Sequence, residues 1–232
     1  MPATRTFTLR HVQLARALFA AVAALMITFS PDHSASVGLA VFSGFALVTA
    51  LVLALAAWLV APTGWRWPFV LLAVVAGLTG MAAGVPAWRS TPLFFVLIVV
   101  WGVLSGVIEL VAGIRGRRMR PLAEGASARR IAAVEGSRDA ILIGALSLLL
   151  AVAVVCVPST YALNYSIAEA GTFTLTGITL AVGLFGAYAA IVAVFLGIAG
   201  LSPRPAIRPG ERAANDISGA APAAPAENEG SA

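Results

Sequence analysis

Residues 14–60 read LARALFAAVAALMITFSPDHSASVGLAVFSGFALVTALVLALAAWLV, which is two long apolar runs separated by the short turn Pro31–Ser36. A run of about 20 apolar residues is long enough to cross the hydrocarbon layer of a membrane as a helix. A proline cannot continue a helix without losing a backbone hydrogen bond, so Pro31 marks the end of the first run. The stretch therefore predicts two membrane-spanning helices that are antiparallel neighbours, because the turn between them is so short.

Four further apolar blocks follow along the chain, at residues 67–85, 92–114, 140–157 and 173–200. The apolar residue types make up 60% of the 232 residues and the charged types only 11%, whereas a soluble domain carries about a quarter charged residues. Too little polar surface remains to coat a water-soluble globule. The sequence therefore predicts an all-α integral membrane protein, whose six transmembrane helices form three consecutive hairpins at 14–60, 67–114 and 140–200.

Arginine predicts the orientation of these helices, because all 15 basic residues are arginine and they gather on one side. Fourteen lie in the termini and in alternate connections, and Arg89 alone lies on the other side. The positive-inside rule places the fourteen in the cytoplasm, so residues 1–13 and 202–232 are both expected there. An arginine-rich start before an apolar run is also typical of a signal peptide, but a second apolar block follows Pro31 at once, which favours a retained span. Exclusive use of arginine is typical of a GC-rich bacterial genome, so the bacterial cytoplasmic membrane is the expected location.

The segments outside the spans differ in composition. Residues 115–139 form a basic cytoplasmic loop, in which 127–135 could fold as a short surface helix. The arginines of this loop suit contact with anionic lipid headgroups, although the positive-inside rule explains them without such contact. Residues 159–171 are expected to form a polar extracytoplasmic loop, and the tail 202–232, rich in Pro, Ala, Gly and Glu, to be disordered. The net charge of +5 does not indicate nucleic-acid binding, because the arginines lie between apolar blocks.

A repeated unit organises the six spans. A cationic or ionisable residue precedes a proline by twenty residues three times, in His11–Pro31, Arg66–Pro86 and Arg138–Pro158. Each proline ends the first helix of a hairpin, and the second helix of each hairpin carries a glycine followed by an apolar run. Since every hairpin enters the membrane from the same side, these are parallel repeats, unlike the inverted repeats of many transporters.

The stretches RALFAAVAALMITFSPDHSASVGLAVFSGFALVTALV at 16–52 and WGVLSGVIELVAGIRGRR at 101–118 resemble the HdeD-like family. These are six-helix bacterial inner-membrane proteins of largely unknown function, named for a member implicated in acid resistance. The resemblance implies a multipass protein of the cytoplasmic membrane that takes part in the stress response. It supplies no catalytic residues.

Motifs that would indicate an enzyme are not found in the sequence. Cys156 is the single cysteine, so no disulfide within the chain and no multi-cysteine metal site is expected. The segment Gly102–Gly106 has the wrong spacing for the nucleophile of a rhomboid-type protease, and both histidines, His11 and His33, lie at predicted membrane edges. Zinc-protease motifs and phosphate-binding glycine loops do not occur either. We therefore expect no enzymatic activity, no cofactor and no metal.

Glu109 is the one acidic residue well inside a predicted span, and Ser105 lies one turn before it. Helical spacing places both on a stripe of small residues, and small residues let helices approach closely in lipid. The glycines expected to pack helices together in the fourth and sixth spans are Gly102, Gly106, Gly113, Gly186 and Gly197.

Two interpretations of Glu109 are open. It is either a proton or cation site facing the bundle interior, or a structural acid paired with an arginine. Arg16 stands at a comparable depth on the first span, so we predict that Arg16 and Glu109 pair if their helices touch. His33, in the first outer turn, is either a sensor of external acid or a solvated turn residue. The five tryptophans, Trp101 among them, lie near predicted span ends, where amphipathic rings favour the membrane interface.

The leading functional hypothesis is a non-enzymatic membrane protein that supports envelope or acid-stress tolerance, or that is an accessory subunit of a larger membrane complex. Its expected partners are the lipid bilayer, anionic lipids at residues 115–139, and other membrane subunits or further copies of itself. The alternative is a transporter or channel for a small solute or protons with Glu109 on its path. The low number of polar residues inside the spans disfavours transport.

Overall fold

The structure is a computed structural model that describes residues 8–61, 64–118, 136–167 and 171–202. Within these ranges six helices are long and apolar enough to cross a membrane: α1 (Leu9–Phe29), α2 (Ala35–Leu59), α3 (Trp67–Gly84), α4 (Thr91–Arg118), α6 (Ser137–Val155) and α7 (Gly177–Leu201). They confirm the predicted fold class. The predictions for the surface helix at 127–135, for residues 119–135 of the basic loop and for the tail from 203 onward fall outside the described residues.

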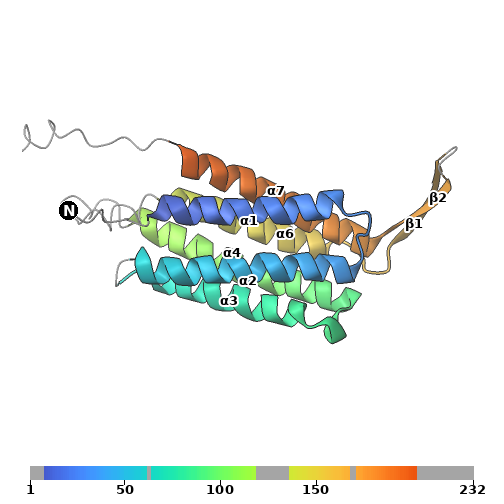
Figure 1. Ribbon diagram of the computed structural model, residues 1–232, viewed down its shortest axis with the longest axis horizontal. Coiled ribbons are helices and arrows are strands. Elements are labelled where there is room, and N and C mark those ends of the chain that lie inside the picture. The colour runs from blue at the N-terminus through green and yellow to red at the C-terminus, as the bar shows by residue number, and fades with distance from the viewer. Residues whose placement is uncertain (1–7, 62–63, 119–135, 168–170, 203–232) are drawn as a thin grey trace, which may run out of the picture. The chain divides into compact units, whose positions relative to one another are not determined.

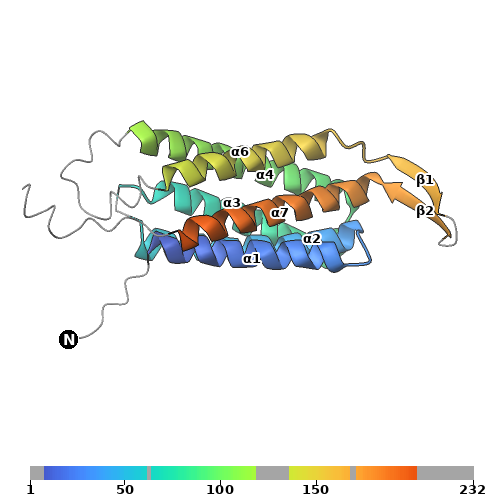
Figure 2. The ribbon, with the colours of Figure 1, turned by 90° about the horizontal axis from the view of Figure 1, so that it is seen from above.

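Consecutive helices run antiparallel and lie side by side around a common axis (Figures 1 and 2). Each helix contacts the one before it and the one after it, and α7 completes the ring against α1. The three most extensive interfaces are α4 with α6, α1 with α7, and α2 with α3. The predicted hairpins are therefore present, but the closest packing joins helices that belong to different hairpins.

The outward surface of the bundle is apolar, as a lipid environment requires. Large side chains on this surface leave more than half of their area exposed, including Leu51 at 68%, Leu149 at 63% and Val194 at 63%. In water such a surface would be unfavourable, whereas hydrocarbon chains solvate it without cost. The spanning helices therefore contact the lipid bilayer, as predicted.

Three helices extend further toward the arginine-rich end than their apolar blocks. α1 begins at Leu9 rather than at residue 14, α4 continues to Arg118 rather than to 114, and α6 begins at Ser137 rather than at 140. Polar residues stabilise these added turns, because charges of the right sign favour a helix terminus and capping side chains satisfy its free backbone groups. Asp139 lies in the first turn of α6, and Thr8 and His11 form a capping box at the start of α1. The apolar blocks thus mark the length of helix in lipid rather than the whole helix.

A β-hairpin replaces the loop expected at 159–171, so that prediction was wrong. β1 (Ala162–Ile167) pairs antiparallel with β2 (Gly171–Thr176), from the register Ala162↔Thr176 to Ile167↔Gly171. The last helix consequently begins at Gly177 rather than at Phe173. Gly177 also passes so close to the Pro158 carbonyl oxygen that a Cβ at this position would collide with it. The sequences ALNYSI and TFTLT alternate polar with apolar residues, and this alternation was the available signal for strands.

Aromatic side chains fill the axis of the bundle between its middle and the end that carries the hairpin. We call Phe42, Phe45, Trp101, Phe185 and Tyr188 the aromatic cluster. Its rings meet edge to face with centroids 5.5–5.8 Å apart, and they come from α2, α4 and α7. Trp101 is only 4% exposed, so its assignment to the membrane interface was wrong. It lies ten residues after Thr91, the first residue of α4, and therefore well inside that helix.

Candidate functional site

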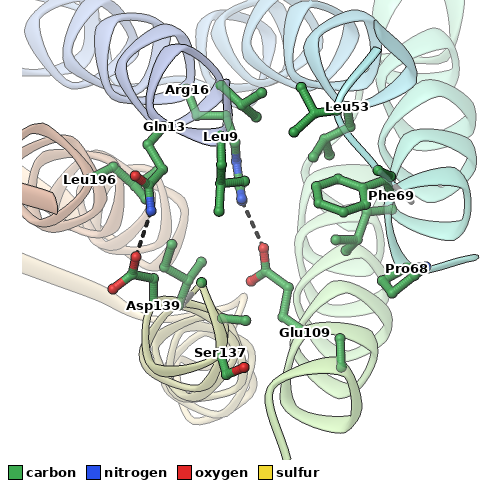
Figure 3. A pocket seen from close by; sticks show the side chains of 18 of the residues that line it. Leu9, Gln13, Arg16, Leu53, Pro68, Phe69, Glu109, Ser137, Asp139 and Leu196 are labelled. Carbon is green, nitrogen blue, oxygen red and sulfur yellow. Dashed lines mark hydrogen bonds and ion pairs between the residues drawn. The ribbon is translucent and has the colours of Figure 1, made fainter. Parts of the chain in front are cut away.

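A cavity of about 100 Å³ lies on the bundle axis toward the arginine-rich end, on the other side of the middle from most of the aromatic cluster. All six spanning helices contribute to its wall. The apolar part of the wall includes Val12, Leu53, Phe69, Ala112, Ile143 and Leu196. The charged side chains that line it are those of Arg16, Glu109 and Asp139 (Figure 3).

Arg16 and Glu109 form an ion pair in this cavity. Arg16 Nη2 donates to Glu109 Oε1 over 2.8 Å, and Glu109 is only 3% exposed. Arg16 lies seven residues from the start of α1 and Glu109 nine from the end of α4, which is about 10–13 Å of helix in each case. The predicted pair is present, but α1 and α4 are not among the closely packed helix pairs, so the two side chains meet across the bundle axis at similar depth. The pairing compensates the burial of the carboxylate, which would otherwise be costly inside a membrane.

Gln13 and Asp139 form a second polar pair beside the first. Gln13 Nε2 donates to Asp139 Oδ2 over 2.5 Å, and Gln13 is 5% exposed. Figure 3 shows the side chains of Gln13 and Arg16 reaching from α1 toward α6 and α4, respectively. Gln13 precedes Arg16 by three residues, so both lie on one face of α1. Sequence reasoning missed this pair because the apolar blocks begin at 14 and 140, one residue beyond each partner.

Two buried oxygen atoms in this site have no hydrogen-bond partner among the described protein atoms. They are Glu109 Oε2 and Gln13 Oε1. Native proteins satisfy nearly all buried polar atoms, because an unsatisfied one costs about 1–3 kcal/mol. Both atoms belong to residues that line the cavity. The site is therefore rich in acceptors.

A buried hydroxyl pair lies between the cavity and the aromatic cluster. Ser147, one turn after the cavity residue Ile143, donates to the Ile143 carbonyl oxygen over 2.9 Å. Its Oγ also lies 2.9 Å from the hydroxyl oxygen of Tyr188. The Tyr188 ring then packs against Trp101 with centroids 5.6 Å apart. Polar contacts extending from the cavity thus meet the aromatic cluster at Tyr188.

Glycines create the close helix interfaces. A Cβ added at Gly102, Gly106 or Gly113 would lie 2.7–2.9 Å from a backbone carbonyl oxygen of α6. One added at Gly186 would lie 2.7 Å from the Ile27 side chain of α1. These four predicted positions therefore lie at helix contacts.

Gly197 does not have the packing role expected of it, since nothing lies within 4 Å of a Cβ built there. Gly200, three residues later, is instead the glycine that packs against α1, where an added Cβ would come within 2.7 Å of the Leu14 side chain. The two positions are three residues apart and so lie on nearby faces of α7, but only Gly200 lies against α1.

The remaining candidate residues do not join the cavity. Ser105 is 5% exposed on α4 but is not among the lining residues. His33 is half-buried in the outer turn, where the neighbouring Asp32 accepts hydrogen bonds from the backbone and the hydroxyl of Ser34. A role for His33 in sensing pH stays a prediction. In the described ranges, no three His, Cys, Asp or Glu side chains gather as a metal site would need.

Comparison of the chain with protein-family models, curated proteins and solved structures finds no match. The six long apolar helices and their lipid-facing surface identify it as a multipass integral membrane protein.

Proposed function

We propose that this chain is a non-enzymatic accessory protein of the bacterial cytoplasmic membrane. It holds an extracytoplasmic partner protein through the β1–β2 hairpin and thereby serves envelope and acid-stress tolerance. The stress role is supported by the resemblance to the HdeD-like family, and the extracytoplasmic placement by the distribution of arginine. The partner role is supported by the hairpin itself.

The hairpin is the observation that carries the proposal. β1 and β2 form a two-stranded sheet, which continues from α6 and α7 past the ends of the helices (Figures 1 and 2). Two strands alone are marginally stable in water. The outer edge of each strand also presents backbone donors and acceptors that another strand can pair with. Strand addition to such an edge is a common way to bind an extended segment of a partner.

The side chains of the hairpin favour such a contact. On one face Thr174 Oγ1 donates to Asn164 Oδ1 over 2.6 Å, and Ser166 and Thr172 are exposed. On the other face Leu163 is opposite Leu175 in the register, and 49% of Leu163 is exposed. A partner strand would bury this leucine while the polar face stays hydrated.

The test is purification from native membranes in mild detergent, followed by identification of the proteins that remain bound. Residues 162–176 are replaced by a flexible Gly/Ser linker of equal length, and Thr174→Val is the matched control because valine also favours a strand. We expect a stoichiometric partner with the wild type and with the control. The linker variant should lose the partner and grow poorly at low external pH, while its bundle unfolds at an unchanged temperature. A wild type without a partner, or a linker variant that keeps it, would contradict the proposal.

A second candidate function is transport of protons or a small solute with Glu109 on the path. The specific observation in its favour is the unpartnered Glu109 Oε2 at a cavity on the bundle axis. Against it, the aromatic cluster packs across the axis beyond the cavity, so a path would need those rings to separate. Flux into reconstituted vesicles distinguishes the two functions. Flux that Glu109→Gln abolishes would replace the accessory proposal.

A further inference from the structure

The spanning helices associate as three tight pairs, α1 with α7, α2 with α3, and α4 with α6. In the first pair Gly200 lies against Leu14, and Arg10 Nε donates to the Gly200 carbonyl oxygen. Close packing and hydrogen bonds are what hold helices together in lipid, where no hydrophobic effect drives apolar surfaces together. The α1–α7 pair is therefore held together up to its arginine-rich end.

The α1–α7 pair is connected to the other described helices at one end only. α1 leads into α2 through the short turn at residues 30–34, and α7 follows α6 through the β1–β2 hairpin. Both connections lie at the end of the bundle that carries the hairpin (Figures 1 and 2). At the arginine-rich end α1 begins and α7 ends, so no connection between described helices ties this pair to the others there.

Packing between the pairs is dense at the hairpin end. A Cβ added at Gly38, in the first turn of α2, would lie 2.7 Å from Val182 of α7 and 2.8 Å from Phe94 of α4. The side chains of Val182 and Phe94 are both fully buried, and the aromatic cluster fills the axis beside them. Interlocked side chains of this kind allow little relative movement. This end of the bundle is therefore suited to be a hinge.

The contact between the α1–α7 pair and the α4–α6 pair is looser at the arginine-rich end. The cavity of about 100 Å³ lies there, and α6 with α7 is the least extensive interface between consecutive spanning helices. Two polar contacts cross the cavity from α1 to the α4–α6 pair: Arg16 with Glu109, and Gln13 with Asp139 (Figure 3). Water can replace a side-chain hydrogen bond, whereas it cannot replace the close backbone packing inside a tight pair.

Two buried acceptors favour separation of the pairs at this end. Glu109 Oε2 and Gln13 Oε1 have no donor among the described protein atoms, and a buried acceptor without a donor is unfavourable. Separation admits water to both oxygen atoms and to the groups that the two broken contacts release. Hydration therefore lowers the free energy of an open arrangement relative to the closed one.

We propose that the bundle contains a hinged opening between its α1–α7 and α4–α6 pairs. The α1–α7 pair pivots at the hairpin end and moves away from the α4–α6 pair at the arginine-rich end, which opens the cavity to water. The latch that holds the closed arrangement is the two contacts Arg16–Glu109 and Gln13–Asp139. The movement requires no partner at the hairpin, so it is measured on the purified chain alone.

Distances between spin labels measure the opening on the full chain in lipid nanodiscs, in a Cys156→Ser background. One label pair, Leu142→Cys on α6 and Leu201→Cys on α7, is placed at exposed positions at the arginine-rich end. A second pair, Phe29→Cys on α1 and Val155→Cys on α6, is placed at exposed positions at the hairpin end. We expect a closed and a longer, open distance for the first label pair, and a single distance for the second.

Variants of the latch change the proportion of the two distances. Gln13→Met keeps the length of the side chain and removes its hydrogen bond to Asp139, so the ratio of open to closed molecules should rise by about tenfold. Arg16→Met combined with Glu109→Leu removes the other contact without leaving a buried charge. This double variant should raise the ratio as well.

Ser43→Ala is the matched control, because Ser43 donates to the Gly80 carbonyl oxygen inside the tight α2–α3 pair. It should leave the distances of both label pairs unchanged. The proposal is refuted if neither latch variant raises the open fraction at the arginine-rich end. It is equally refuted if the distance at the hairpin end lengthens by as much, or if Ser43→Ala has the same effect, because the helices would then loosen everywhere. If one latch variant does not fold, the other decides.

Discussion

Two glycine-to-alanine substitutions provide a matched test of how the helices pack. A Cβ at Gly106 would lie 2.9 Å from the Gly144 carbonyl oxygen of α6 and 2.7 Å from Leu148 Cγ. The leucine side chain can move aside, but the carbonyl oxygen belongs to a helical backbone and cannot move without shifting α6. Gly197 lies in the same kind of apolar helix and has nothing within 4 Å of its added Cβ.

The expected magnitudes follow from these distances. Alanine in place of a helical glycine stabilises a helix by about 0.5–1 kcal/mol, and this gain is common to both variants. Gly106→Ala adds an overpacking cost of about 1–3 kcal/mol, because the 2.9 Å from the added Cβ to the carbonyl oxygen is about 0.5 Å shorter than an ordinary van der Waals contact. Gly197→Ala should therefore raise the free energy of unfolding slightly. The free energy of unfolding of Gly106→Ala should be lower than that of Gly197→Ala by about 1–3 kcal/mol.

The assay is reversible unfolding in mixed detergent micelles, followed by tryptophan fluorescence, with both variants in the same micelle composition. Comparing two alanine variants removes the shared contribution of helix propensity. Equal free energies of unfolding, or a lower value for Gly197→Ala, would refute the inference that α4 and α6 depend on backbone contact at Gly106.

Two other predictions concern the ion pair and the topology. Arg16→Met should destabilise the bundle by about 3–5 kcal/mol in the same unfolding assay, because it leaves the Glu109 carboxylate buried without its partner, and adding Glu109→Leu should restore most of that loss. If the double variant recovers less than a third of the stability lost in Arg16→Met, burial of an unpaired carboxylate is not the cause of that loss. In a Cys156→Ser background, a cysteine at Ser34 should react with an impermeant thiol reagent in intact cells and one at Arg117 should not; the reverse pattern would invert the orientation.

Much of the fold could be predicted from the sequence, because span length and apolar content are local properties. Six apolar blocks gave six helices, and Pro31 marked the end of the first. The β-hairpin was missed because average hydropathy does not separate a period of two from a helical period, so Phe173 was assigned to the last span. The alternation in that segment is short, and the apolar run of α7 follows it directly.

The candidate site was partly predictable for a similar reason. The pairing of Arg16 with Glu109 follows from depth along two antiparallel helices, which residue counting supplies. Gln13 and Asp139 lie in the added helical turns, where hydropathy gives no signal. Trp101 was misplaced because its residue type suggested the membrane interface, although it lies nine residues inside the predicted block at 92–114. Counting residues gives the depth of Arg16 and Glu109, but that their side chains meet across the axis depends on how the helices are arranged.

The ring closure between α1 and α7 has a consequence for biosynthesis. α1 leaves the ribosome before the other five spanning helices described here, yet one of its most extensive interfaces is with α7, which is made after them. Its Arg16 must also wait for Glu109 on α4 before its charge is compensated. A nascent chain that has inserted only α1–α3 therefore holds an unpaired guanidinium at the membrane and an uncovered flank. Such a chain depends on the translocon or on a membrane chaperone until the sixth span is released.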